Sequence, residues 1–146
     1  MPITSGAPRA PLDPMTARIA LLRTQADIID FRLGHRPADI LVRDFATAAE
    51  LAAYEDGVDA VADQYDRIEG LTVSGTTVTY TRRSDDPEAE TVTAAAEVKF
   101  GTAAEAQAYC RGLEDAEGYA APLLIDDTDE RFEQLLAWAA ATDGIV

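Results

Sequence analysis

The sequence predicts an α+β fold in which two duplicated βαβ units form a ferredoxin-like mixed sheet with helices on one face. Three observations lead to this expectation. A 14-residue segment beginning at Phe45 returns at Phe100, which is 100 − 45 = 55 residues later. Strand patterns flank both copies, and apolar periodic segments extend the chain at its two ends. The predicted architecture therefore also has an N-terminal and a C-terminal helix.

The two copies of the repeat share residues that specify the start of a helix. Both contain Phe-x-Thr-Ala-Ala-Glu, followed at equal spacing by Tyr and Gly. Thr-x-x-Glu is a capping box, in which the Thr hydroxyl accepts from the amide three residues on and the Glu reaches back. We therefore expect a strand to end at each Phe and a helix to begin two residues later. The first of these helices is expected to continue to Ile68.

Strands are expected on both sides of each repeat helix. Residues 39–45 and 91–100 precede the two helices, and residues 122–125 follow the second. Between the copies, residues 71–73 and 76–82 flank Ser74-Gly75, which is typical of a β-hairpin. The repeat units therefore span residues 38–73 and 91–125, within a single domain of residues 16–146. Residues 1–15 are rich in proline and lack periodicity, which predicts a disordered arm.

The N-terminal helix is predicted over residues 16–33, with Thr16 as its N-cap and Gly34 beyond its end. Apolar residues follow the i, i+3, i+7 pattern of one helix face: Ile19, Leu22, Ala26, Ile29 and Leu33. A second side carries Leu21, Ile28 and Phe31. Two apolar sides indicate burial against a partner or between two layers. We therefore expect Leu21, Ile28 and Phe31 to form the interface of a homodimer.

Charge excludes several classes of partner. The chain has 12 Lys and Arg and 27 Asp and Glu, giving a net charge of −15. Residues 1–46 sum to +1 and the remainder to −16. Binding to nucleic acid or to an anionic membrane depends on clustered basic residues, so neither is expected. No apolar run reaches the length of a membrane span, and no secretory leader is expected, so we predict a cytoplasmic location.

Three features could suggest catalysis or metal binding, but each has a simpler structural explanation. His35 has no evident partner in sequence and follows a helix end, where a cationic side chain is favourable. Cys110 is expected mid-helix in an acidic surrounding, which opposes thiolate formation. Residues 126–130 contain four carboxylates, but their spacing is not that of an EF-hand, and Asp127 with Glu130 could cap the last helix. We expect no catalytic residue, metal or cofactor.

One set of acidic residues is a candidate recognition surface. In a helix that continues to Ile68, four aspartates lie within roughly 80° of one another and opposite the apolar face. They are Asp56, Asp59, Asp63 and Asp66. Like charges at these spacings destabilise a helix, which favours a role in binding, although a solvated face of an acidic protein is the simpler alternative.

The sequence thus favours a small, non-catalytic interaction protein. Its acidic body would dock on a basic, possibly nucleic-acid-binding, surface of a partner protein, as a regulator or inhibitor would. The alternative is a ferredoxin-like dimer that binds a ligand or catalyses a reaction in an unrecognised cleft. A contiguous acidic surface without a deep pocket would favour the first function, and a cavity lined by polar groups would favour the second.

Overall fold

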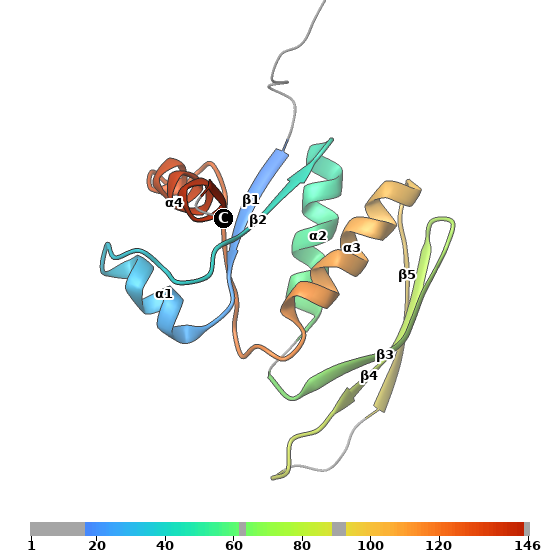
Figure 1. Ribbon diagram of the computed structural model, residues 1–146. Coiled ribbons are helices and arrows are strands. Elements are labelled where there is room, and N and C mark those ends of the chain that lie inside the picture. The colour runs from blue at the N-terminus through green and yellow to red at the C-terminus, as the bar shows by residue number, and fades with distance from the viewer. Residues whose placement is uncertain (1–16, 62–63, 89–92, 145–146) are drawn as a thin grey trace, which may run out of the picture.

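The computed structural model describes residues 17–61, 64–88 and 93–144, which form a mixed α+β structure (Figure 1). This part of the chain contains four helices and two three-stranded antiparallel sheets. The elements stack in layers, because α1 and α4 cover one sheet and the pair α2 and α3 lies between the two sheets. The predicted disordered arm, residues 1–15, lies outside the described residues.

The chain passes twice through the element order ββαβ, with one added helix in each pass. The first pass comprises β1 (Ala17–Leu22), α1 (Gln25–Arg32), β2 (Leu41–Phe45), α2 (Ala48–Ala60) and β3 (Asp66–Ser74). The second comprises β4 (Thr77–Ser84), β5 (Thr93–Lys99), α3 (Ala103–Ala116), β6 (Leu123–Ile125) and α4 (Phe132–Gly144). The predicted hairpin joins the two passes, and Gly75 at its turn has a φ of 61°, a conformation that favours glycine.

Each pass gives its last strand to the other sheet. The strand orders are β2-β1-β6 and β3-β4-β5. β6, from the second pass, pairs with β1, and β3, from the first pass, pairs with β4. The predicted order of strand, helix and strand in residues 38–73 and 91–125 therefore occurs, but its two strands lie in different sheets. The single ferredoxin-like mixed sheet is replaced by two antiparallel sheets.

The predicted N-terminal helix is the largest local difference. Residues 17–22 form the central strand of the first sheet, and the helix begins only at Gln25. Thr24 is the N-cap, and its side chain accepts a hydrogen bond from the Asp27 amide at 3.2 Å. The run Ile19-Ala20-Leu21-Leu22 is buried throughout, because helices cover both faces of this sheet. Such continuous apolar runs are typical of a strand buried on two sides.

α2 and α3 form the centre of the molecule and begin as the repeat predicts. The Thr47 and Thr102 hydroxyls each accept a hydrogen bond, at 3.1 Å, from the amide three residues on. Phe45 contacts Tyr54 and Phe100 contacts Tyr109, with ring centroids 5.1 and 5.2 Å apart. The helices cross at two glycines, since a Cβ on Gly57 would lie 3.1 Å from the Gly112 Cα. The two halves of this helix pair are therefore matched in detail.

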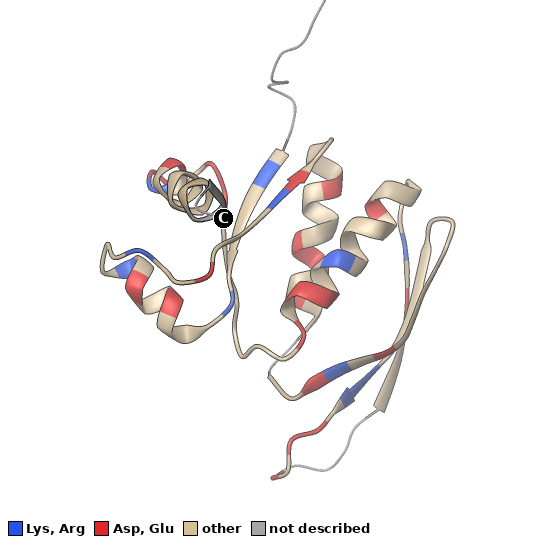
Figure 2. Ribbon diagram, in the orientation of Figure 1, with Lys and Arg blue, Asp and Glu red and all other residues tan. Residues whose placement is uncertain are grey.

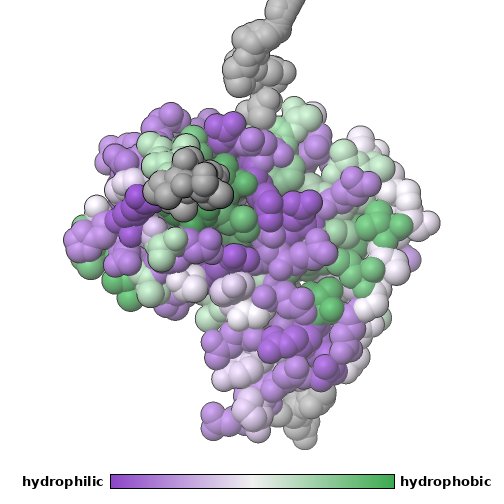
Figure 3. All heavy atoms as spheres, viewed as in Figure 1, coloured by the Kyte–Doolittle hydropathy of each residue, from purple (hydrophilic) through white to green (hydrophobic). Residues whose placement is uncertain are grey.

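The surface divides unevenly between polar and apolar residues. In the view of Figure 3, hydrophilic residues dominate over α2, while hydrophobic surface lies toward the hairpin end of the second sheet and also near α1 and α4. Among the large apolar side chains of the described residues, Ile29, Leu33 and Val73 are exposed. The fold thus presents α2 as a polar element on one face of the molecule.

Candidate functional site

The four aspartates of the predicted acidic row do not share one helix face. α2 ends at Ala60, because the Val61 backbone is extended with φ −86° and ψ 109°. Asp56 and Asp59 lie exposed on α2, whereas Asp66 is the first residue of β3 and is 5% exposed. Its carboxylate lies 3.8 Å from the Arg82 guanidinium. Asp63 lies outside the described residues, so the predicted row is reduced to its first two members.

A different set of carboxylates gathers beside these two residues. Glu55, Asp56 and Asp59 belong to α2, and Asp126 follows β6 in sequence but lies near Glu55 in space. Burial raises the pKa of Glu55, and the negative charges of Asp126, Asp59 and Asp56 raise it further. We call these four residues the α2 acidic surface. Hydrogen bonds from the Thr128 side chain and backbone lower the pKa of Asp126, which keeps that carboxylate charged.

Basic residues are paired with carboxylates elsewhere in the molecule. The arginines that form ion pairs within the described residues are Arg18, Arg23, Arg43, Arg67, Arg82, Arg83 and Arg131. None of these pairs includes a residue of the α2 acidic surface. Figure 2 shows acidic residues along α2, with basic residues lying mostly on other elements. The charge of this surface is therefore not neutralised by ion pairs within the described part of the chain.

The predicted dimer interface lies inside the chain. Leu21 on β1 is 1% exposed and packs in the core beneath α2 and α3. Ile28 and Phe31 on α1 are each 3% exposed and pack against β1, β6 and α4. The Arg131 guanidinium also covers the Phe31 ring, 4.0 Å from its centroid. The large apolar side chains exposed here are instead Ile29 on α1 and Leu33 at its C-cap, so the prediction exchanged the buried and the exposed side of this helix.

A buried polar cluster joins β2, α2 and α3. The Asp115 carboxylate accepts two hydrogen bonds from Arg43, both at 3.0 Å, and a third from the Tyr54 hydroxyl at 2.7 Å. Tyr54 is fully buried and Asp115 is 6% exposed. Hydrogen bonding to Asp115 raises the pKa of Arg43. Sequence analysis missed this cluster, since residues 43 and 115 lie far apart in the chain and neither belongs to a motif.

The second copy of the repeat tyrosine makes a different contact. Tyr109 and Tyr80 lie with their hydroxyl oxygens 2.9 Å apart. Burial is the largest cause that raises the pKa of Tyr109, and the hydrogen bond to Tyr80 raises it further. Burial is also the largest cause that raises the pKa of Tyr54, and the hydrogen bond to Asp115 adds to it. Both hydroxyls are therefore held in their neutral form by the fold.

Alkaline conditions are expected to destabilise the protein for this reason. The unfolded chain loses the protons of Tyr54 and Tyr109 near pH 10, while the folded state retains them. Each tyrosine then lowers the free energy of unfolding by up to about 1.4 kcal/mol per pH unit above pH 10. Denaturant unfolding at several pH values between about 9 and 11 measures this slope. The Tyr54→Phe/Tyr109→Phe variant should show a shallower slope, and an equal slope would contradict this assignment.

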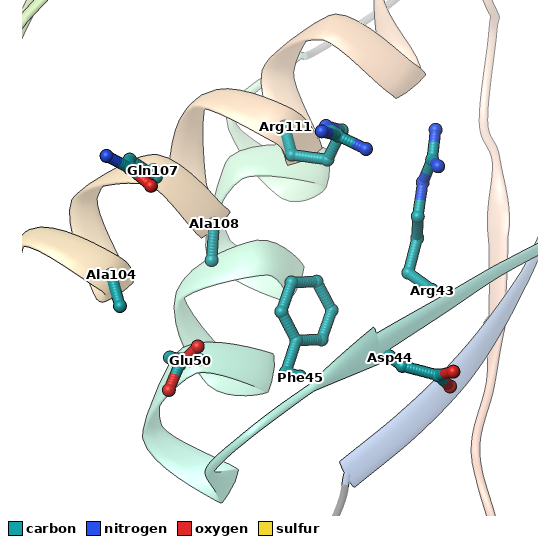
Figure 4. Close-up of a pocket in the computed structure, with 8 residues that line it drawn as sticks. All are labelled: Arg43, Asp44, Phe45, Glu50, Ala104, Gln107, Ala108 and Arg111. Atoms are coloured by element: carbon teal, nitrogen blue, oxygen red, sulfur yellow. The ribbon is translucent and has the colours of Figure 1, made fainter.

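One hollow in the described surface lies where β2, α2 and α3 meet. It has a volume of about 210 Å³ and is open to solvent. Its polar lining comes from Arg43, Asp44, Glu50, Gln107 and Arg111, and its apolar lining from Phe45, Ala104 and Ala108. Figure 4 shows Arg43 and Arg111 extending from β2 and α3 toward the same space, with the Phe45 ring below them. We call this hollow the β2–α3 pocket.

The remaining candidate residues lie apart from this pocket. His35 is exposed in the turn after α1. Cys110 is buried, and burial followed by the charge of Glu114 raises the pKa of its thiol, as the sequence predicted. α4 begins at Phe132, so Asp127 and Glu130 do not cap it; the Asp129 carboxylate instead accepts from the Arg131 amide. Among the described residues, no cluster of three or more His, Cys, Asp or Glu is arranged to hold a metal ion.

The chain matches no family model, no curated protein and no solved structure. None of the helices in the described part of the chain is long and apolar enough to span a membrane.

Proposed function

We propose that this chain is a small acidic interaction module whose α2 acidic surface docks on a basic surface of a partner protein, as a regulator or inhibitor. The observation that carries the proposal is the concentration of unpaired carboxylates on one helix. Glu55, Asp56 and Asp59 repel one another and Asp126, and no ion pair within the described residues offsets this repulsion. A partner that supplies Lys or Arg would relieve it and would be steered toward this face.

The proposed partner is a protein with a basic patch, and the proposal does not depend on a long acidic row along one helix. Such a row would need the four aspartates of the predicted long helix, and α2 ends after the second of them. Most of the described arginines form ion pairs away from α2, so they do not neutralise the carboxylates of the α2 acidic surface. This supports a partner that supplies basic residues. Exposed charges at the edge of a protein–protein interface mainly affect the association rate and the salt dependence of binding.

Binding of a fluorescent nona-arginine peptide tests the proposal. The variant Glu55→Gln/Asp56→Asn/Asp59→Asn is expected to bind about tenfold more weakly at low salt, and its affinity should depend less on salt. Removing the mutual repulsion should leave its melting temperature unchanged or slightly higher. Fluorescence anisotropy across a salt series and a thermal melt provide both measurements.

The matched control removes the same number of charges elsewhere. Glu88, Glu97 and Glu133 are exposed on other segments and are changed together to glutamine. This control should bind the peptide nearly as well as the native chain. Equal weakening by both triple variants would show that only net charge matters and would overturn the proposal.

We also infer that the two ββαβ passes arose by duplication. The inference is supported by the matched caps at Thr47 and Thr102 and the matched ring pairs that follow them. The reciprocal contact of Gly57 with Gly112 supports it further.

A further inference from the structure

The residues that line the β2–α3 pocket have equivalents in the other copy of the repeat, on β5, α3 and α2. Each equivalent lies 55 positions away in the sequence. Half of the lining residues are of the same type as their equivalents. The matched pairs are Phe45 with Phe100, Glu50 with Glu105, Ala104 with Ala49, and Ala108 with Ala53. The two copies thus share one framework of a strand-end phenylalanine, a helix-cap glutamate and two small residues.

The other four lining positions differ in chemistry. Arg43 and Arg111 of the pocket correspond to Val98 and Asp56, while Asp44 and Gln107 correspond to Lys99 and Ala52. The pocket thus has two guanidinium groups and an amide where the equivalent positions have a valine, an aspartate and an alanine. The two copies therefore differ at the charged and amide groups of the lining and agree at its phenylalanine, its glutamate and its alanines.

Arg43 is held in place before any ligand arrives. Its Nε and Nη2 donate to the Asp115 carboxylate, which is itself fixed by the Tyr54 hydroxyl. The Arg43 side chain is 28% exposed and lines the pocket. An anchored donor loses little side-chain entropy on binding.

Arg111 provides the second positive group and has no ion pair with any described residue. It is exposed on α3 and extends toward the same space as Arg43 (Figure 4). The two acids of the pocket are already engaged, since Asp44 pairs with Arg18 and Glu50 accepts from the Thr47 hydroxyl at 3.0 Å. Arg111 is therefore the basic side chain of the pocket whose donors are not used in an ion pair with a described residue.

We propose that the β2–α3 pocket binds a small monocarboxylate with a flat apolar body, whose carboxylate lies between Arg111 and Arg43. A guanidinium fork matches the geometry of a carboxylate. The Glu50 and Asp44 carboxylates in the lining carry negative charge, which disfavours a doubly charged phosphate more than a monocarboxylate. Phe45 supplies a ring against which a flat apolar group packs. The volume, about 210 Å³, limits the ligand to a size below that of a typical drug-like molecule.

Titration of the isotope-labelled protein with benzoate, followed by amide NMR, tests this proposal. Saturable shifts are expected for Gln107, Arg111 and Phe45, with a dissociation constant on the order of millimolar. Benzamide has the same shape without the charge and should bind at least tenfold more weakly. Arg111→Gln should weaken benzoate binding about tenfold, whereas Arg32→Gln, which removes an exposed arginine of α1, should leave it unchanged.

Four outcomes would overturn the proposal. These are no saturable shift at tens of millimolar benzoate, equal binding of benzamide, equal affinity in Arg111→Gln, and inorganic phosphate binding as tightly as benzoate. The benzoate probe is an anion, and the pocket is distinct from the α2 acidic surface. A failure of benzoate binding would therefore not contradict the docking proposal, and a failure of nona-arginine binding would not contradict the pocket proposal.

Discussion

Replacing Gly57 by alanine is expected to lower the free energy of unfolding by about 3 kcal/mol or more. A Cβ at this position would lie 2.1 Å from the Tyr109 carbonyl oxygen and 3.1 Å from the Gly112 Cα. Both obstacles are backbone atoms of α3, so no side-chain rotation relieves the contact. Alanine favours the helix by about 1 kcal/mol, which is too little to offset a separation of the two helices.

Gly101→Ala is the matched control for this substitution. Among the described residues, its one neighbour within 4 Å would be the Glu105 Oε1, 3.1 Å away at the end of a flexible side chain. Denaturant unfolding should show a small change for Gly101→Ala and a large loss for Gly57→Ala. Native stability in Gly57→Ala would contradict the close crossing of α2 and α3.

Asp115→Ala is expected to cost about 3 kcal/mol or more, because it removes the common acceptor of a buried cluster. The fully buried Tyr54 hydroxyl would lose its partner, and Arg43 would lose both hydrogen bonds that fix it. An unsatisfied buried donor costs more than the net value of the bond it made. Asp115→Asn, which keeps one acceptor oxygen, should lose about half as much.

An exposed ion pair provides the comparison. Arg18 and Asp44 form a pair whose side chains are 43% and 51% exposed. Asp44→Ala should therefore cost no more than about 1 kcal/mol. Denaturant unfolding of both variants measures the difference. Equal losses for Asp44→Ala and Asp115→Ala would show that burial adds nothing to the Arg43–Asp115 pair.

Local sequence patterns were sufficient for the starts of the two central helices and for most strands. The Thr-x-x-Glu motif predicts the start of α2 and of α3, and both hydroxyl-to-amide bonds occur. Alternation between Thr77 and Tyr80 predicts β4, and Ser74-Gly75 predicts its hairpin with β3. These features succeed because caps, turns and alternation are determined by residues within a few positions of one another.

The N-terminal segment shows where local patterns mislead. Ile19, Leu22, Ile29 and Leu33 satisfy helical spacing, yet Ile29 is 54% and Leu33 65% exposed. The residues 19–22 are apolar without interruption because their strand is covered on both faces, and such a run matches a helical pattern equally well. Thr24, three residues before Asp27, was the local evidence for a later helix start.

The end of α2 was not predictable from periodicity either. Tyr65 and Ile68 continue the helical spacing of the apolar face, but the backbone leaves the helix at Val61 and β3 follows. This pairing with β4 overrides the local preference. The prediction that four aspartates share one helix face was wrong for the same reason, because it required a helix that continued to Ile68.

The pocket and the buried cluster could be predicted only in part. Comparing the two repeat copies position by position would have placed Arg111 against Asp56 and Arg43 against Val98. It would not have shown that Asp115 reaches Arg43, since that contact depends on how α3 crosses the first sheet.

The exchange of terminal strands constrains how this chain can fold. β1 cannot complete its sheet until β6 has been placed, and Ala20 then stands opposite Ile125 near the other end of the described chain. Closing so long a loop carries an entropic cost before the contact repays it, which slows folding relative to a fold built from local pairs. A half-chain ending at the Gly75 turn would carry β3 without β4 and β1 without β6, leaving both strand edges unpaired and prone to aggregate. We therefore expect neither half to be stable without the other.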